Sequence, residues 1–152
     1  MDVRSQLVEK IEARFQQITR ENLYRTDIGL KVFPWRKAPM DVHSIPGIVF
    51  RDEVAQMNNG SDEDEVPIGL WEHRLKVHVE IHFKGATSAS EARKALDDVV
   101  RAVYRDRGDK WDGLAEFTDL HAHAIDVEQG GDVICGAEAV FIVIYRTPFG
   151  TL

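Results

Sequence analysis

The chain has 152 residues, of which 43% are hydrophobic and 30% are charged. This length and composition predict one folded domain over residues 1–152, because a chain of this size buries roughly 68 to 70% of the surface that its unfolded form exposes. The formal net charge of -7 has the wrong sign for binding to nucleic-acid phosphates, and the single cysteine excludes an internal disulfide. We therefore expect no direct sequence-specific nucleic-acid partner.

The sequence pattern does not suggest export or membrane insertion. The N-terminal segment is charged throughout and has no apolar block ahead of a cleavage site. The longest apolar run, residues 137–145, contains Glu138 and has the length of a strand rather than the ~20 residues of a membrane-spanning helix. We expect a soluble, cytoplasmic protein with no membrane partner.

The N-terminal part predicts one helix and two short strands. Apolar residues recur every three or four positions from Val3 to Ile18, so we expect an amphipathic helix over about 3–22. Segments 26–33 and 47–55 have the pattern of short strands, and the prolines between them favour extended or looped backbone. Residues 55–67 include four consecutive acids and a proline, which predicts a flexible acidic loop or arm.

The clearest pattern lies in residues 71–83. Odd-numbered side chains there are apolar, apart from His73, and even-numbered side chains are polar. This alternation predicts a long strand, which at about 3.3 Å per residue extends roughly 40 Å. We expect the odd-numbered face to meet the helices and the even-numbered face to be left to water or to a neighbouring subunit.

The C-terminal half predicts a helix over about 89–106 and two strands, 119–128 and 133–147, joined by a glycine-containing hairpin turn. The last strand is apolar at every position from Ala139 to Tyr145, so it is either central or covered from outside the chain. The predicted fold class is α+β: a mostly antiparallel β-sheet with two α-helices packed on one face, a long central strand and a C-terminal β-hairpin.

Histidines provide the one pattern that suggests metal binding. His78, Glu80 and His82 share a strand face at steps of about 7 Å, and His121 and His123 lie on another predicted strand. If the two strands were adjacent, these side chains could bind Zn²⁺. The steps are too long for His78 and His82 to share an ion unaided, so we favour solvated or cross-strand-paired histidines.

No other pattern indicates catalysis, so we expect neither an enzyme nor a cofactor. The sequence has no nucleophile elbow, P-loop or dinucleotide-binding glycine motif. Cys135 lies in an apolar strand and is expected to pack inertly in the core. Asp97 and Asp98 are expected on a solvated helix face, and His73 is expected to be a partly buried structural histidine.

Several segments are awkward in a monomer but suited to assembly, namely the long strand, the doubly apolar last strand and the acidic arm. Aromatic and arginine side chains near them are of the kind that interfaces favour. The alternative is that these side chains only cover the edges of the core. The candidate interface residues are Trp35, Arg36, Asp62, Glu63, Asp64, Glu65, Phe141, Val143, Tyr145, Arg146 and Phe149.

The order of these segments resembles the tail terminator (minor tail protein U-like) proteins of long-tailed bacteriophages and related prophages. The resemblance rests on the N-terminal helix followed by TDIGL (26–30) and on RLKVHVEIHF (74–83) running into ASEARKALDDVVRAV (89–103). It continues through the terminal hairpin to VFIVIYRTPFG (140–150). It covers most of the chain in layout and includes no catalytic motif.

The resemblance implies a non-enzymatic protein without a cofactor that closes into a homo-oligomeric ring, expected to be a hexamer, on the end of the tail tube. Such a ring stops tube polymerisation and presents a surface for head joining. The implied partners are other copies of the chain, the tail tube protein and the head–tail connector protein. The implied location is the virion tail, with assembly in the host cytoplasm.

The same resemblance makes residues 55–67 a contact arm and the C-terminal strand a contact with another subunit or with the tube. The acids at 62–65 would line the ring or meet basic groups on the tube protein. Three alternatives stay open. They are a head–tail joining or tail-completion protein, a small metal-binding enzyme that uses the histidine-rich strand face, and a free-standing regulatory binding domain.

Overall fold

A computed structural model describes residues 1–34, 46–58, 66–85, 88–130 and 132–152. The described residues form two α-helices, α1 (Val3–Phe15) and α2 (Ser88–Tyr104), and three short 3₁₀ segments, η1 (Arg20–Asn22), η2 (Ile28–Leu30) and η4 (Arg105–Gly113). Their strands are β1 (Val32–Pro34), β2 (Gly47–Asn58), β3 (Leu70–Lys84), β4 (Phe117–Gly130) and β5 (Asp132–Pro148).

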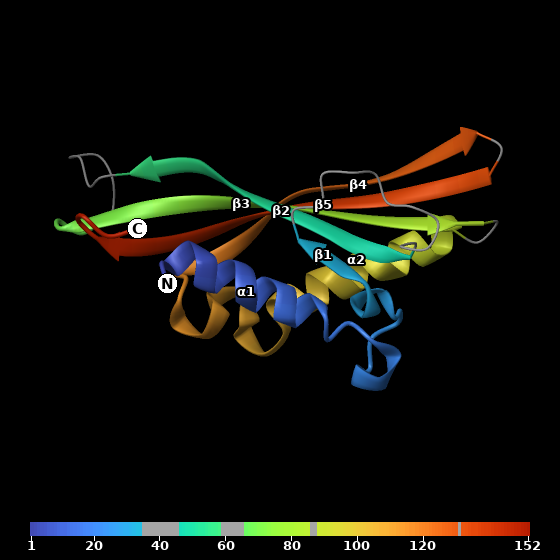
Figure 1. The fold of residues 1–152 in the computed structure, drawn as a ribbon, viewed down its shortest axis with the longest axis horizontal. Coiled ribbons are helices and arrows are strands. Elements are labelled where there is room, and N and C mark those ends of the chain that lie inside the picture. The colour runs from blue at the N-terminus through green and yellow to red at the C-terminus, as the bar shows by residue number, and fades with distance from the viewer. Residues whose placement is uncertain (35–45, 59–65, 86–87, 131) are drawn as a thin grey trace.

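The helices and the sheet form two layers (Figure 1). The strand order is β1-β2-β3-β5-β4, and every neighbouring pair is antiparallel except β1 with β2. Both helices lie on one face of the sheet, and we call the opposite face the open face. The predicted α+β fold with a mostly antiparallel sheet is confirmed.

The central strand β3 follows its sequence pattern. Its odd-numbered side chains Leu75, Val77, Val79 and Ile81 are at most 2% exposed, because they face the helices. Its even-numbered side chains from 72 to 82 are partly exposed on the open face. The alternation of apolar and polar residues in the sequence therefore gives β3 one buried face and one accessible face.

The first helix is shorter than predicted. The carboxylate of Asp2 caps α1 by accepting from the backbone N–H of Ser5 at 2.8 Å, but the helix ends at Phe15 rather than near residue 22. Ile18 is still fully buried, because the chain turns and the N–H of Gly29 donates to its carbonyl at 2.9 Å. A long-range hydrogen bond thus replaces continuation of the helix.

The same turn shortens the first predicted strand. Residues 28–30 form η2, and only Val32–Pro34 pair as β1, so the strand prediction for 26–33 is wrong in its first half. A Cβ on Gly29 would lie 2.4 Å from the carbonyl oxygen of Phe15, which shows how closely the two segments pack. β2 continues to Asn58, past the predicted end at 55, because β3 pairs with it along this length.

The remaining elements agree with prediction within a few residues. α2 covers 88–104, where 89–106 was predicted, and its buried Ala92 and Ala95 are small, which permits close approach to the sheet. β4 and β5 form the predicted C-terminal hairpin. β5 lies between β3 and β4, so its apolar character reflects a central position. In the part of the chain described, no helix is long and apolar enough to cross a bilayer.

Candidate functional site

The histidines proposed as metal ligands do not converge. β5 separates β3 from β4, so His78 and His82 lie two strands away from His121 and His123. Nε2 of His78 instead lies 3.3 Å from Oε1 of Glu53, and Nε2 of His82 lies 3.8 Å from Oε2 of Glu80. Among the described residues no group of three His, Cys, Asp or Glu side chains could hold an ion.

Two other sequence predictions concern single buried groups. Cys135 is fully buried, and burial raises the pKa of its thiol, as expected for a core cysteine. His73 is also buried: its ring stacks on Tyr145 at 4.6 Å, its Nε2 lies 2.8 Å from Thr147 Oγ1, and burial lowers its pKa. Both groups are structural.

Asp98 corrects the prediction of a solvated acidic face. Its side chain is fully buried, and Oδ2 accepts from the backbone N–H of Thr26 at 2.8 Å and from the hydroxyl of Thr26 at 2.6 Å. The backbone N–H of Arg25 also donates to this carboxylate at 3.1 Å. Only Asp97, half exposed, lies on the surface. Asp98 therefore ties α2 to residues 25–26.

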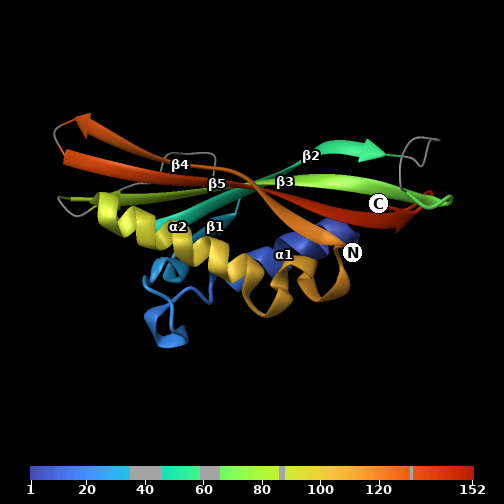
Figure 2. The same ribbon diagram turned by 180° about the vertical axis from the view of Figure 1, so that it is seen from behind.

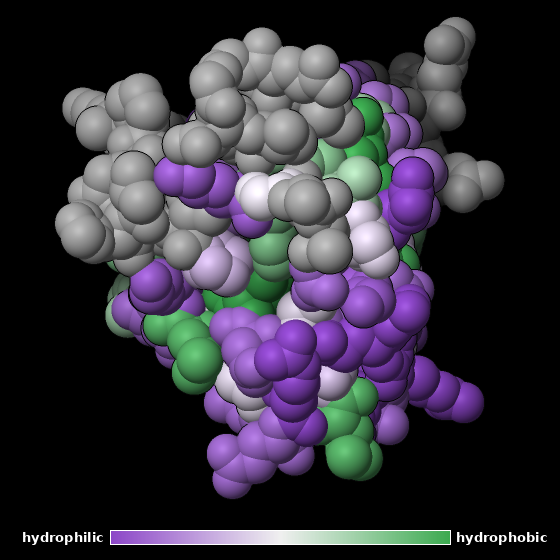
Figure 3. All heavy atoms as spheres, turned by 90° about the vertical axis from the view of Figure 1, so that its right-hand side faces the viewer, coloured by the Kyte–Doolittle hydropathy of each residue, from purple (hydrophilic) through white to green (hydrophobic). Residues whose placement is uncertain are grey.

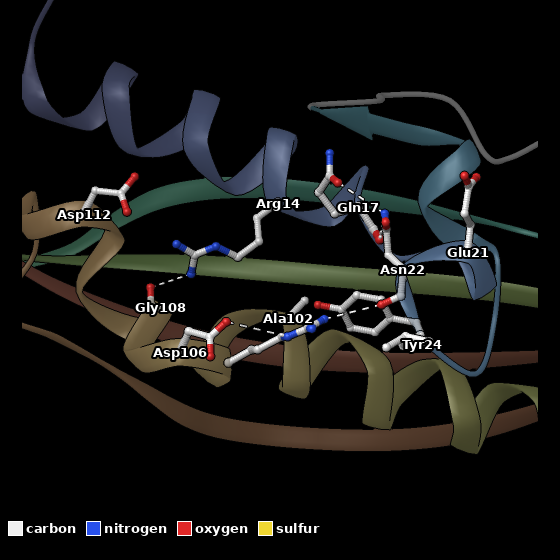
Figure 4. Close-up of a pocket in the computed structure, with 11 residues that line it drawn as sticks. Arg14, Gln17, Glu21, Asn22, Tyr24, Ala102, Asp106, Gly108 and Asp112 are labelled. Atoms are coloured by element: carbon white, nitrogen blue, oxygen red, sulfur yellow. Dashed lines mark hydrogen bonds and ion pairs between the residues drawn. The ribbon is translucent and has the colours of Figure 1, made fainter.

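A cleft of about 570 Å³ lies between α1, the 20–24 segment, α2 and η4 (Figure 4). The guanidinium of Arg14 points into it, lies 3.8 Å from the centre of the Trp111 ring, and donates to the carbonyl oxygens of Val103 at 3.2 Å and of Gly108. Burial lowers the pKa of Arg14. This arginine is committed to holding η4 against α1.

Other charged groups of the cleft are also engaged. Arg105 donates to the carbonyl oxygen of Asn22 at 3.4 Å and lies 3.7 Å from the carboxylate of Asp106, and Asp112 accepts from Lys10 at 2.8 Å. Four non-glycine residues of η4 have positive φ: Asp106, Arg107, Trp111 and Asp112. Arg14 and these charged groups thus hold η4 against α1 and the 20–24 segment.

The candidate interface residues fall into three groups. Phe141, Val143 and Tyr145 are at most 2% exposed because they face the helices, so their prediction as contact side chains is wrong. Phe149 is 51% exposed, and Arg146 is partly exposed and pairs with Glu72 at 3.2 Å. The rest lie outside the described residues, and these are Trp35, Arg36, Asp62, Glu63, Asp64 and Glu65.

Exposed apolar side chains gather where β2 ends, β3 begins and β5 ends, at the left of Figure 1. We call this region the distal end and define it by the exposed Val54, Met57, Ile68 and Phe149, with the partly buried Trp71 beside them. The N–H of Phe149 donates to the carbonyl oxygen of Gly69 at 3.1 Å, and the rings of Trp71 and Phe149 lie 5.7 Å apart. Sequence reasoning found Phe149 but missed Ile68, which is 96% exposed.

The opposite end of the molecule has a different surface (Figure 3). Hydrophilic side chains cover most of its visible helical layer, and hydrophobic side chains form separate patches among them. The open face between the two ends carries ion pairs between neighbouring strands, including Arg51 with Glu80 at 3.3 Å and Lys76 with Glu53 at 3.9 Å. The distal end is thus the candidate contact surface of the described chain.

The fold therefore defines a two-layer α+β protein with a mostly antiparallel sheet. Comparison with protein-family models and with curated proteins found no match to this chain.

Proposed function

We propose that the chain is a structural assembly protein of a long-tailed bacteriophage or related prophage, a tail terminator whose copies form a ring on the end of the tail tube. The observation that carries the proposal is the apolar distal end. Ile68, Phe149 and Met57 are 96%, 51% and 48% exposed there. Large apolar side chains gathered in the open are typical of a surface that a partner covers.

The mechanism in this proposal is complementarity of surfaces, with no cofactor and no catalytic step. The distal ends of the copies dock on the last layer of the tube protein. The rest of the ring offers no surface on which a further tube layer can add, so polymerisation stops. The other side of the ring then meets the head–tail connector protein.

The acidic residues 62–65 also have a role in the proposal, although they lie outside the described residues. They begin four residues after the end of β2 in the sequence, and their four negative charges would contact basic groups on the tube protein or line the ring. Negative charge in a ring lumen keeps the channel hydrated and repels DNA phosphates.

A double substitution, Ile68→Ser with Phe149→Ser, tests the proposal in the phage or prophage that encodes the chain. We expect tails of uncontrolled length, or tails without heads, in electron micrographs, because the distal end loses apolar surface while the core is untouched. Leu30→Ser is the matched control, since Leu30 is 73% exposed in η2, away from the distal end. Normal virions from the double variant would contradict this docking surface, and normal virions without the protein would contradict the function.

A further inference from the structure

Leu23 is an exposed leucine held in a strained backbone conformation. It directly follows η1, it is 76% exposed, and its backbone has φ 67° and ψ 23°, in the left-handed region. This conformation is unfavourable for a residue with a Cβ, and glycine or asparagine normally occupies it. A leucine at this position therefore disfavours the isolated protomer twice, through backbone strain and through exposed apolar surface. Such a combination is typical of a side chain that a partner covers.

Hydrogen bonds fix the backbone on both sides of Leu23. Its own N–H donates to the carbonyl oxygen of Arg20 at 3.0 Å, and the N–H of Tyr24 donates to the carbonyl oxygen of Thr19 at 3.1 Å. In Figure 1 and Figure 2, η1 is the part of the described chain that extends farthest from the sheet. Leu23 is thus presented to a partner in a fixed position, and a side chain fixed in advance loses little conformational entropy on binding.

An apolar groove of about 260 Å³ lies between α2 and β4, on the side of the protomer that Figure 2 shows in front. The hydroxyl of Tyr104 donates to the carbonyl oxygen of Thr118 at 2.7 Å, so β4 is tied to α2 beside the groove. The groove therefore offers apolar side chains to a partner's side chain and does not depend on an open strand edge. Its apolar lining is half-buried and consists of Leu96, Val100, Leu120 and Ile125.

The segment that carries Leu23 and the apolar groove lie on opposite sides of α2. Asp98 binds residues 25–26, while Leu96 and Val100 line the groove. Each of these two apolar residues is two positions from Asp98, which places it about 160° away around the helix axis. A contact between the two surfaces in different copies is therefore head-to-tail, and it repeats from copy to copy until a ring closes.

The charges beside the two surfaces are complementary. Glu21 is exposed in η1, two residues before Leu23, and Arg93 is exposed at the rim of the groove. Neither charged side chain has a hydrogen-bond or ion-pair partner among the residues that the structure describes. The acid at the same rim, Asp97, lies 3.8 Å from Arg25 of its own copy. Opposite charges that meet across a contact favour that contact and fix its orientation.

We infer that Leu23 of one copy binds in the apolar groove between α2 and β4 of the next copy, with Glu21 beside Arg93. The inference rests on the proposed function, since this repeated contact is how the ring closes. It explains why a leucine occupies a position that glycine or asparagine would suit better in a single protomer. The distal end takes no part in the contact, so it stays available for the tube protein.

Leu23→Asn tests the contact, with Leu30→Ser as the matched control. Asparagine adopts the left-handed conformation readily, so the variant should be at least as stable as the wild type in urea unfolding. It removes the buried leucine from each contact, so sedimentation equilibrium should give an association constant about tenfold lower or less. Leu30 is 73% exposed in η2 and lies outside this contact, so Leu30→Ser should associate as the wild type does.

Charge reversal tests the same contact independently. Glu21→Arg alone and Arg93→Glu alone should each weaken association, and the double variant should restore it to within about threefold of the wild type. The first substitution makes the chain less negative and the second makes it more negative. An effect of net charge alone would therefore move association in opposite directions in the two single variants.

Association that survives Leu23→Asn, or a double variant that associates no better than the single variants, overturns the inference. A wild-type protein that stays monomeric at about 1 mM also overturns it. Copies that associate through another surface reject the Leu23 contact and leave the ring intact as a proposal. A specific Leu23 contact together with normal virions in the absence of the protein supports the contact and rejects the role in tails.

Discussion

Replacing Asp98 by alanine is expected to be the most destabilising single change to a polar residue described here. Three hydrogen bonds end on its carboxylate, two from Thr26 at 2.8 and 2.6 Å and one from the N–H of Arg25 at 3.1 Å. Each hydrogen bond to a charged group contributes about 1.5–3 kcal/mol, and the buried donors of Thr26 would be left without an acceptor. With partial relaxation, we expect the free energy of unfolding to fall by about 3–5 kcal/mol.

Two further variants define the control for this prediction. Asp97→Ala removes the adjacent acid, which is half exposed and lies 3.8 Å from Arg25, and should change stability by less than about 0.5 kcal/mol. Asp98→Asn keeps one acceptor oxygen for Thr26 but directs an amide N–H toward the N–H of Arg25, so its effect should be intermediate. Urea unfolding followed by circular dichroism measures all three. A loss below about 1 kcal/mol for Asp98→Ala would refute the assigned role.

Two other predictions test packing and burial. Gly29→Ala should lower the free energy of unfolding by about 1–3 kcal/mol, because its Cβ would lie 2.4 Å from a backbone oxygen of Phe15. Gly136→Ala is the control and should be nearly neutral, because its Cβ would have no contact closer than 3.6 Å. Equal effects of the two substitutions in urea unfolding would contradict this prediction. The lowered pKa of His73 means that the unfolded chain binds its proton more readily, so stability should fall as the pH drops below about 6.5. His73→Gln should reduce that fall between about pH 7 and about pH 5, and an unchanged fall would show that other groups cause it.

Periodicity predicted the elements well because each reflects a local property of the chain. The alternation in 71–83 required a strand with one buried face, and β3 has this face toward the helices. The spacing of Leu7, Ile11 and Phe15 required a helix, and all three are buried in α1. The errors came at element ends, where Gly29 and its contact with Ile18 stop α1 early through a hydrogen bond that no local pattern contains.

The candidate surfaces were predicted less well, because exposure depends on which segments cover each other. The apolar character of Phe141, Val143 and Tyr145 predicts contact residues, yet they belong to a strand enclosed by two others and covered by helices. Ile68 has the same apolar character and is almost completely exposed. All four side chains are largely apolar, and their exposure differs because different segments cover them.

The amino-acid sequence by itself determined the fold class, the two amphipathic helices, the long alternating strand and the terminal hairpin, since these depend on spacing within a few turns or strand repeats. Only the tertiary structure decided that β5 separates the histidines of β3 from those of β4, that Asp98 is buried, and that apolar side chains gather at the distal end. Strand order and burial arise from contacts between residues far apart in the chain, and the spacing of apolar residues within a segment does not determine these contacts.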